Sequence, residues 1–380
     1  MPSASPPDLS HITLLFLTSA EHSIVPSIND PYSTPVSISA LPLPNIGLAA
    51  CLAQHCGADV RFSSFRFPAA GSTRASLARM DAVCLLGSRG WDGGAVGAEQ
   101  NVKNERQGSV DGSAFARFLD QTLGPLAEAL GSRKLMVLNS VEVLSWGLDR
   151  RHLLDLMDSG KVKVVKTRFL SENFGVRGLD YLRQTAKDVS GEHGRAVRVR
   201  WSVGGGTWGG GYVISDPINI KRQDLEDVQR ALDLDFERNG DQDAKKGIIM
   251  AQEILQSMKS QGVFSLVYIG GQLSHAALQR PKNADSRSEY YEIDEEGAEN
   301  IEERALPQGA RKSGDFIAGY LDKRFGHGKV AYMRVDGVAE DDQSFAIIGV
   351  EVIDPELWLT KGDAGERVGM FARHVVQGRG

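Results

Sequence analysis

The sequence predicts an α/β protein with more than one domain, and three observations support this prediction. The chain has 380 residues, which is more than one ordinary hydrophobic core accommodates. Apolar runs alternate with helical segments over about the first 140 residues, which is typical of a doubly wound parallel sheet. Later apolar runs, between residues 195 and 353, indicate the strands of an antiparallel or mixed sheet.

The first part of the chain shows the strand and helix signals of a parallel unit. The run ITLLFLT is uninterrupted, as expected for a strand that is buried on both faces. Strands are predicted at 12–18, 58–65, 80–87 and 134–139, and helices at about 46–55, 113–129 and 151–157. Residues 93–113 are rich in glycine and polar side chains, so they predict a long surface loop.

The second part begins with a short predicted strand in the segment GKVKVVKTRFL, residues 160–170. Residues 195–214 predict two strands joined by a glycine-rich turn. Further strands are predicted within 248–255, 263–278, 331–338 and 346–353. The acidic run 289–303 indicates a solvated loop.

Composition narrows the class of protein. The net charge of -6 gives no basic surface for nucleic acid or an anionic membrane. The three cysteines, Cys51, Cys56 and Cys84, lack zinc-ligand spacing and lie in apolar stretches, so packing as reduced thiols is favoured over a redox or metal role. The N-terminus lacks a basic region, and the run at 12–18 is too short to span a membrane. We therefore expect a cytoplasmic protein.

Four segments resemble, in the same order, the motifs of a known family. They are SRGWDGG at 88–94, VLNSVEVLSWGLDRRHLLDLMDSGKVKVVKTRFL at 137–170, IIMAQEIL through ADSR at 248–287, and RVDGV with EVIDPELWL between 334 and 359. Together they cover roughly residues 80–360 and resemble the ATP-grasp superfamily, in particular the carboxylate–amine ligases of the D-cycloserine synthase and glutathione synthetase-like branch.

The resemblance implies an ATP-grasp fold with three domains. An N-terminal Rossmann-like (pre-ATP-grasp) domain is expected at 1–155, a small central lid domain at 156–250, and a C-terminal α+β catalytic domain at 251–380. Dimers are common in this fold, so a homodimer is one expected state.

Positively charged and glycine-rich positions are the candidates for binding the phosphates of ATP. By resemblance, Arg150 and Arg200 stand where the family has lysines, and Arg287 matches an arginine that contacts the γ-phosphate and the transferred group. The segment GGGTWGGG, including Gly204, Gly205 and Gly206, corresponds to the mobile lid over the triphosphate, since glycine allows close approach of the backbone. Alternatives are surface arginines and a plain flexible hairpin.

The adenine base is expected, by resemblance, at the hinge formed by Gln252, Glu253, Ile254 and Leu255. Isoleucine and leucine are equally at home in a hydrophobic core, so this role depends on the alignment alone. The family usually has a ribose-binding glutamate shortly after the hinge, and this chain has Val263 at that position.

Two carboxylates are the candidates for Mg²⁺, which prefers hard oxygen ligands. Asp336 and Glu351 match two of the three metal-binding positions of the family, and Gly349 stands at the third. Asp354 is near in sequence and is the residue that could compensate. The alternative is a pair of exposed strand carboxylates.

Three further residues are considered for the site. Arg334 could orient Asp336 or contact the substrate. Asp92 follows a predicted strand at the end where open α/β sheets bind ligands, which makes it a substrate candidate, although a simple turn aspartate fits as well. For His275, which lies on a predicted strand, a structural role is favoured over a catalytic one.

By this resemblance the chain is an ATP-dependent ligase with ATP and Mg²⁺ as cofactors. It would activate a carboxylate of a small amino-acid-like substrate as an acyl phosphate, which an amine then attacks to form an amide or a ring. The departures at Gly349 and Val263, and the two arginines in place of lysines, bear on function more than on fold. Two alternatives therefore stay open: a degenerate ATP-grasp protein that binds a ligand or partner without ATP turnover, and altered non-ligase chemistry.

Overall fold

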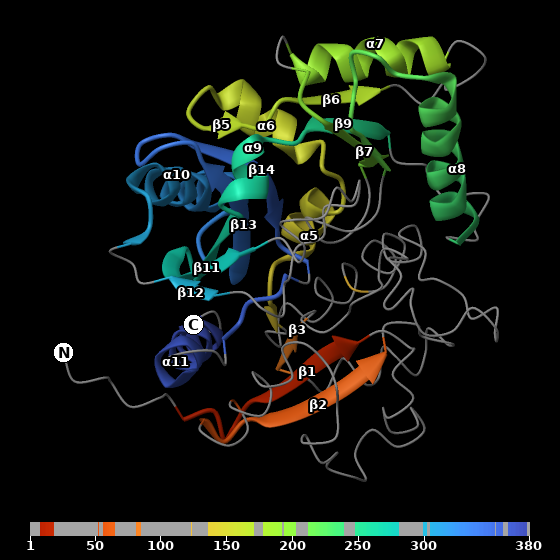
Figure 1. Ribbon diagram of the computed structural model, residues 1–380. Helices are drawn as coiled ribbons and strands as arrows, with labels where there is room; N and C mark the ends of the chain where they lie inside the picture. Colours follow the sequence, from red (N-terminus) through yellow and green to blue (C-terminus); the bar gives the residue numbers. More distant parts are fainter. Residues whose placement is uncertain are drawn as a thin grey trace.

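The computed structural model describes residues 8–18, 52, 56–64, 81–84, 123, 136–170, 178–191, 194–202, 212–238, 248–280, 299–301, 305–353, 355–359 and 364–377. Within these residues the strands form three sheets, a four-stranded N-terminal sheet, a six-stranded central sheet and a four-stranded lid sheet. In Figure 1 the N-terminal strands lie at the bottom, the central sheet lies above them, and the lid sheet with its two long helices lies at the top.

The N-terminal sheet is parallel, as predicted. It consists of β1 (Thr13–Thr18), β2 (Asp59–Ser64), β3 (Ala82–Cys84) and β4 (Met136–Val137) in the order β2-β1-β3-β4. Cys56 and Cys84 are buried free thiols, which agrees with the predicted packing role. The predicted loop 93–113, nearly all of the predicted helices at 46–55 and 113–129, and Cys51 lie outside the described residues.

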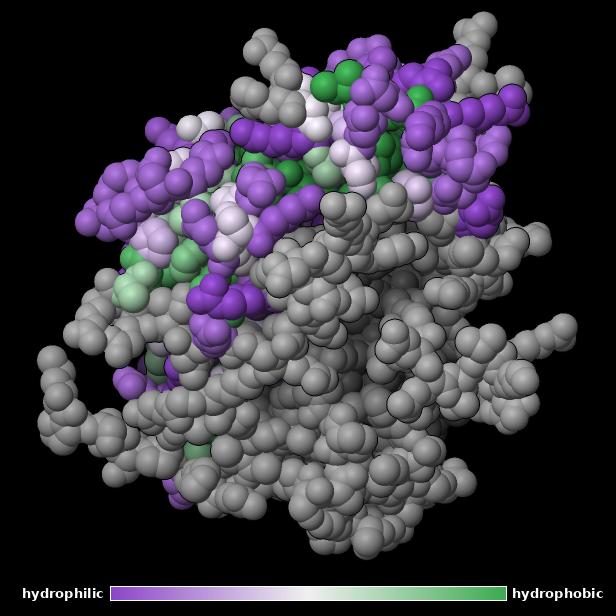
Figure 2. Space-filling model, viewed as in Figure 1, coloured by the Kyte–Doolittle hydropathy of each residue, from purple (hydrophilic) through white to green (hydrophobic). Residues whose placement is uncertain are grey.

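The lid sheet is antiparallel and has the order β6-β9-β7-β8. Its strands are β6 (Thr167–Leu170), β9 (Ile249–Glu253), β7 (Val197–Trp201) and β8 (Tyr212–Ile214). The two strands expected within 195–214 are thus confirmed. Leucine and valine side chains of α7 (Gly178–Ser190) and α8 (Arg222–Arg238) pack on one face of this sheet. Their outer surfaces are mainly hydrophilic (Figure 2).

The segment 160–170 forms two strands in different sheets, where the sequence predicted one. β5 (Lys163–Val164) pairs in parallel with β14 of the central sheet, and β6 belongs to the lid sheet. Between them, the Val165 N–H donates to the carbonyl of Ile347, and Val165 is buried. The crossing is invisible in the sequence because only two residues separate the two strands and no turn residue lies between them.

The central sheet has the order β12-β11-β10-β13-β14-β5 and is antiparallel except for the β14–β5 pair. Its long strands are β10 (Val263–Ile269), β11 (Gln272–Gln279), β13 (Tyr332–Ala339) and β14 (Phe345–Glu351), which confirms the predicted antiparallel or mixed sheet. Within the acidic run that was predicted to be a loop, β12 (Glu299–Ile301) pairs with β11 instead. An edge strand tolerates such charged residues because one side of it faces solvent.

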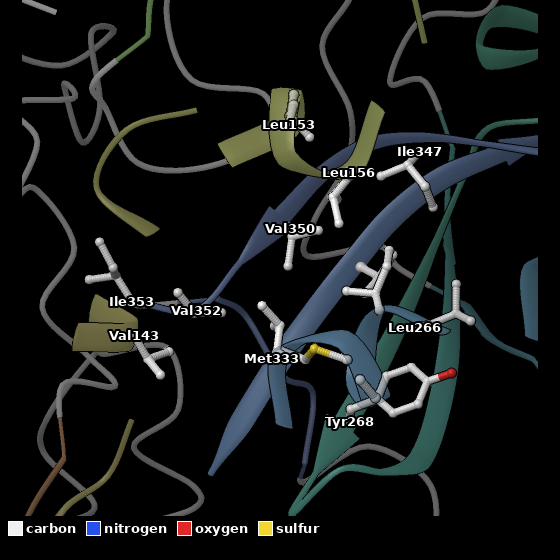
Figure 3. Close-up of a cluster of buried hydrophobic side chains, with 14 of the residues drawn as sticks. Val143, Leu153, Leu156, Leu266, Tyr268, Met333, Ile347, Val350, Val352 and Ile353 are labelled. Carbon is white, nitrogen blue, oxygen red and sulfur yellow. The ribbon is translucent and has the colours of Figure 1, made fainter. Parts of the chain in front are cut away.

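Helices cover both faces of the central sheet. On one face lie α5 (Val141–Gly147), α6 (His152–Ser159) and α10 (Gln308–Phe325), and only α6 was predicted. Figure 3 shows Leu156 of α6 near Ile347 and Val350 of β14, and Val143 of α5 near Val352 and Ile353. On the other face lie α9 (Gln256–Ser260) and α11 (Ala364–Gln377). None of the helices in the described part of the chain is long and apolar enough to cross a membrane.

Asn139 joins the N-terminal unit to the central sheet. It is fully buried, follows β4, and has a φ of 63°, a left-handed conformation that asparagine tolerates. Its side-chain amide donates to the carbonyls of Tyr332 and Val352 at 2.8 and 2.5 Å. Its side-chain oxygen accepts from the N–H groups of Ala331 and Tyr332 at 2.7 and 3.1 Å. One side chain therefore satisfies four backbone groups.

We expect Asn139→Ala to lower the free energy of unfolding by about 2–4 kcal/mol, because it leaves buried backbone groups without partners. Asn139→Gly, which removes the same bonds but relieves the left-handed backbone, should lose somewhat less. Denaturant unfolding measures both, with Asn219→Ala, an exposed asparagine bound to Asp216, as the control. A loss below about 1 kcal/mol in both Asn139 variants would contradict this role.

Candidate functional site

A buried cluster of charged side chains lies where the lid sheet meets the central sheet. Arg150, between α5 and α6, contacts Glu351 at the end of β14, with Nη2 and Oε1 3.1 Å apart. The Arg150 N–H also donates to the carbonyl of Ser202, just after β7, at 2.9 Å. Arg200 lies on β7, and both arginines are only 3% exposed. The cluster therefore brings together two residues predicted as phosphate ligands and one predicted as a metal ligand.

Strand alternation explains why arginines of β7 point toward this cluster. Val197 and Val199 are buried in the core of the lid, under α7 and α8. Successive side chains of a strand point to opposite faces, so Arg198 and Arg200 project from the other face. The period of two, VRVR, was the sequence signal for this arrangement.

Several guanidinium groups influence one another and Glu351 in this cluster. Burial and the neighbouring guanidinium groups of Arg150 and Arg198 hold the pKa of Arg200 well below its usual range. Burial alone would raise the pKa of Glu351, but the guanidinium groups of Arg150, Arg334 and Arg200 outweigh it and lower that pKa. Three cations thus act on one carboxylate. A polyphosphate placed here would offset the mutual repulsion of the arginines, so the described residues fit ATP.

His152 belongs to the same cluster, although sequence reasoning did not single it out. It is buried at the start of α6, and its ring stacks on Trp146 with 4.3 Å between centroids. Burial and the nearby Arg150 lower its pKa to about 4, so the imidazole is neutral at pH 7. Neither ring nitrogen makes a hydrogen bond of good geometry within the described residues. Its position two residues after Arg150 was the available signal.

Arg334 and Asp336 form a second, fully buried ion pair on β13. The Arg334 Nε and Nη2 donate to Asp336 Oδ2 at 3.1 and 3.0 Å. The Ser265 hydroxyl also donates to Asp336, and the Gln279 side-chain amide donates to Ser265. Antiparallel pairing places Ser265 directly opposite Asp336. The structure thus places Arg334 in contact with Asp336. Orienting Asp336 was one of the two roles considered for Arg334 from the sequence.

Trp358 helps to hold this arginine. The Arg334 guanidinium carbon lies 5.4 Å from the centre of the Trp358 ring, and its Nη1 donates to the carbonyl of Glu356 at 3.3 Å. The segment ELWL, which resembled the end of a family motif, therefore helps to fix the orientation of Arg334.

Among the described residues, Asp336 and Glu351 do not form a metal site by themselves. Asp336 pairs with Arg334 and Glu351 pairs with Arg150, so each predicted ligand is engaged by an arginine. Gly349 lies opposite Asp336 in the β13–β14 register and offers no carboxylate. Within the described residues, no three His, Cys, Asp or Glu side chains are close enough together to hold a metal ion. The metal role of Asp336 and Glu351 stays a prediction, and Asp354 lies outside the described residues.

The predicted adenine hinge lies at the end of β9. Gln252 donates to Thr167 Oγ1 and to the carbonyl of Ile348, which connects the lid to the central sheet. Glu253 pairs with Arg195 at 3.0 Å, and the N–H groups of Glu253 and Ile254 donate to backbone carbonyls. Ile254 and Leu255 are buried together with Val263 in one apolar cluster. The side chains of Ile254 and Leu255 are therefore packed in the core, which was the alternative considered from the sequence. The adenine role stays a prediction.

The remaining predicted residues fall into two groups. His275 is buried, its Nε2 is 2.8 Å from the carbonyl of Leu357, and its Nδ1 is 3.0 Å from Ser274 Oγ. Burial and Arg367 lower its pKa to about 3, which agrees with a structural histidine. Five predicted phosphate or substrate residues lie outside the described part of the chain: Asp92, Gly204, Gly205, Gly206 and Arg287.

The chain is similar to solved ATP-grasp ligases over nearly its whole length. The D-cycloserine synthetase DcsG matches with a TM-score of 0.61 and 17% identity, covering 97% of this chain and 100% of that one. The D-alanine–D-alanine ligase from Bacillus anthracis matches with a TM-score of 0.55 and 10% identity, covering 97% and 98%. The ATP-grasp ligase PsnB complexed with minimal precursor matches with a TM-score of 0.51 and 16% identity, covering 97% and 99%.

These similarities and the three-sheet architecture define the class of protein. The chain has the ATP-grasp fold, which confirms the fold predicted from its motifs. No protein-family model matches the sequence, and no curated protein matches it. The domain boundaries stay a prediction, and the predicted boundary at residue 250 falls within β9.

Proposed function

We propose that this chain is an ATP-dependent ligase that activates a substrate carboxylate as an acyl phosphate for attack by an amine. The observation that carries the proposal is the buried group of arginines, Arg150, Arg198 and Arg200, which lies close to Glu351 between the lid and central sheets. Burying like charges together is unfavourable, so such a cluster is retained where it serves an anionic ligand. A structure of the Bacillus anthracis ligase is complexed with ATP, which supports a nucleotide as the ligand of this fold.

The protein's own groups have distinct roles in this proposal. Arg150 and Arg200 hold the phosphates, and the glycines at 204–206 cover them. Arg287 lies against the γ-phosphate and stabilises the negative charge that develops as the phosphoryl group passes to the carboxylate. Residues 252–255 lie along the adenine. Mg²⁺ bound with the nucleotide would supply further charge neutralisation, and Asp336 and Glu351 are the carboxylates that would hold it.

The substrate we propose is a small amino acid or derivative that carries the carboxylate, bound near Asp92 and Arg287. DcsG and the D-alanine–D-alanine ligase, whose names refer to amino-acid products, support this class of substrate. The macrocyclase MdnC, another similar structure, is bound with a precursor peptide, so a peptide carboxylate is the next substrate to test.

One observation favours a second candidate function, binding of ATP without turnover. Asp336 is fully buried and its carboxylate accepts from Arg334 and Ser265, while Gly349 replaces the neighbouring carboxylate. A protein with these features binds nucleotide through its arginines and lacks part of the family's catalytic set.

ATP binding and phosphate release, measured with and without Mg²⁺ against a panel of amino acids and their amides, test both candidates. We expect the protein to bind ATP and to release phosphate only when a suitable amino acid is present. Stoichiometric binding with no phosphate release for any substrate would favour the second candidate. Failure of the folded protein to bind ATP at millimolar nucleotide would overturn the proposed function.

A further inference from the structure

The helix α11 packs against both the central sheet and the N-terminal unit. One apolar cluster contains residues of β1, β10 and β11 together with the buried side chains of α11, which are Val368, Phe371, Ala372 and Val375. Figure 1 shows α11 below β11 and close to the N-terminal strands. Release of this helix would therefore uncover apolar surface on both units.

A buried histidine, His374, lies in the last turn of α11. It is 8% exposed and packs against the turn between β10 and β11, where a Cβ atom at Gly270 would lie only 2.8 Å from its Nδ1. Its Nε2 is buried and has no hydrogen-bond partner within the described residues. A neutral imidazole leaves a bare lone pair at this nitrogen, whereas an imidazolium places an N–H donor there.

From this geometry we propose that α11 is released by acid: a proton on His374 breaks the contact with the β10–β11 turn and frees the helix from the central sheet. A buried N–H without an acceptor is unfavourable, and a buried charge without a partner is more so. The protonated ring is therefore accommodated only after the helix has moved away. The inference goes beyond the proposed function and does not depend on ATP binding.

The groups around the ring favour its neutral form. Burial and His327, in the loop after α10, lower the pKa of His374. Asp322 of α10 pairs with His327, with 3.2 Å between Oδ1 and Nδ1, so this carboxylate is engaged by the other histidine. Gly270 and Gly271 of the β10–β11 turn carry no charged side chain.

His275 is the histidine that faces the same helix from β11. Its Nε2 lies 2.8 Å from the carbonyl of Leu357, and burial and Arg367 of α11 lower its pKa to about 3. At about pH 5 the docked protein therefore keeps His275 neutral, and a proton that it gains there follows the release of α11.

The direction of the pH dependence follows from the sign of the pKa shift of His374. A pKa below the ordinary value of 6.5 means that the docked helix binds the proton less well than the released helix does. Docking is therefore fully present above about pH 6.5 and is lost as the pH falls below it. Each pH unit changes the ratio of docked to released helix by up to about tenfold for this one group.

Amide hydrogen exchange of the full chain, measured by mass spectrometry and corrected for the intrinsic effect of pH on exchange, tests the proposal. Between about pH 7.5 and about pH 5, we expect the protection of segment 364–377 to fall about 10–30-fold, while peptides from β13 and β14 keep theirs. In His374→Gln, whose amide does not titrate, the fall should be about fivefold smaller or less still. His11→Gln, which replaces an exposed histidine, is the control and should behave as the parent protein.

The other outcomes contradict the proposal or are decided by the parent protein. Equal falls in the parent protein and in His374→Gln overturn it, and so does protection of 364–377 that does not change with pH. An equal loss in β13 and β14 means that acid unfolds the whole protein, which also overturns it. If His374→Gln lacks protection already at about pH 7.5, a pH titration of the parent protein decides. Loss that begins near pH 6.5 supports release through a histidine, and loss only below about pH 4.5, where carboxylates titrate, overturns it. All of these outcomes leave the proposed function standing.

Discussion

Replacing Arg200 with methionine is expected to weaken ATP binding about 30-fold or more without lowering the stability of the unliganded protein. Removing one partner of a buried charged hydrogen bond costs about 2–5 kcal/mol of binding free energy, which gives this lower bound. Methionine has a similar length and an apolar stem, so it fills the space next to β7 without the charge.

One property of Arg200 explains both the weaker ATP binding and the unchanged stability expected of the methionine variant. The pKa of Arg200 is depressed, so the folded protein disfavours its charged form, and the positive charge costs stability when no anion is bound. The methionine variant removes this cost to stability. It also removes the side chain that would bind phosphate. Such an exchange of stability for binding is characteristic of functional sites.

Denaturant unfolding and calorimetric ATP titration of the same variant measure both quantities. The control is Arg168→Met, an exposed arginine on β6 of the same sheet, for which binding should be unchanged. A purely structural Arg200 would give the opposite result: the methionine variant would be less stable than the parent protein and would bind ATP with unchanged affinity.

Replacing Asp336 with asparagine is expected to lower the free energy of unfolding by about 3–5 kcal/mol. Asp336 and Arg334 are 0% and 1% exposed, and removing one partner of so deeply buried an ion pair leaves the other charge uncompensated. Arg334→Met should cost a similar amount, because it leaves the carboxylate without its main donor.

A double-mutant cycle separates this pair from its surroundings. The variant with both Asp336→Asn and Arg334→Met should lose clearly less than the sum of the single losses, because neither charge is then left alone. The control cycle uses Arg222 and Glu226, a surface pair on α8 with 2.9 Å between Nε and Oε1, where the coupling should be below about 0.5 kcal/mol. A coupling near zero for Asp336 and Arg334 would mean that this ion pair does not form in solution.

The fold was predictable where the sequence carries strong local patterns. The uninterrupted run 12–18 predicted β1, the segment 195–214 predicted β7 and β8, and the motif order across 80–360 predicted the ATP-grasp fold. Most helices were missed. α10 and α11 contain several glycines and charged residues, so their apolar faces became recognisable only through contact with the central sheet.

The candidate site was predictable only in part. Arg150, Arg200 and Glu351 were named from resemblance, and the structure brings them together. His152 was missed because its only sequence signal, a position two residues after Arg150, is not a motif. Ser265 was missed because its part in the site depends on which residue of the neighbouring strand lies opposite it, and a sequence does not give that register.

The sequence by itself determined the fold class and the positions of the charged residues, because periodicity and motif order are local properties of the chain. Only the tertiary structure decided which charges are paired. Arg334 and Asp336 are only two positions apart in the sequence. Arg150 and Glu351 are 201 positions apart, and they meet because α6 packs on β14. Whether a carboxylate is available to a metal or already neutralised depends on such distant contacts and on burial, which local sequence does not encode.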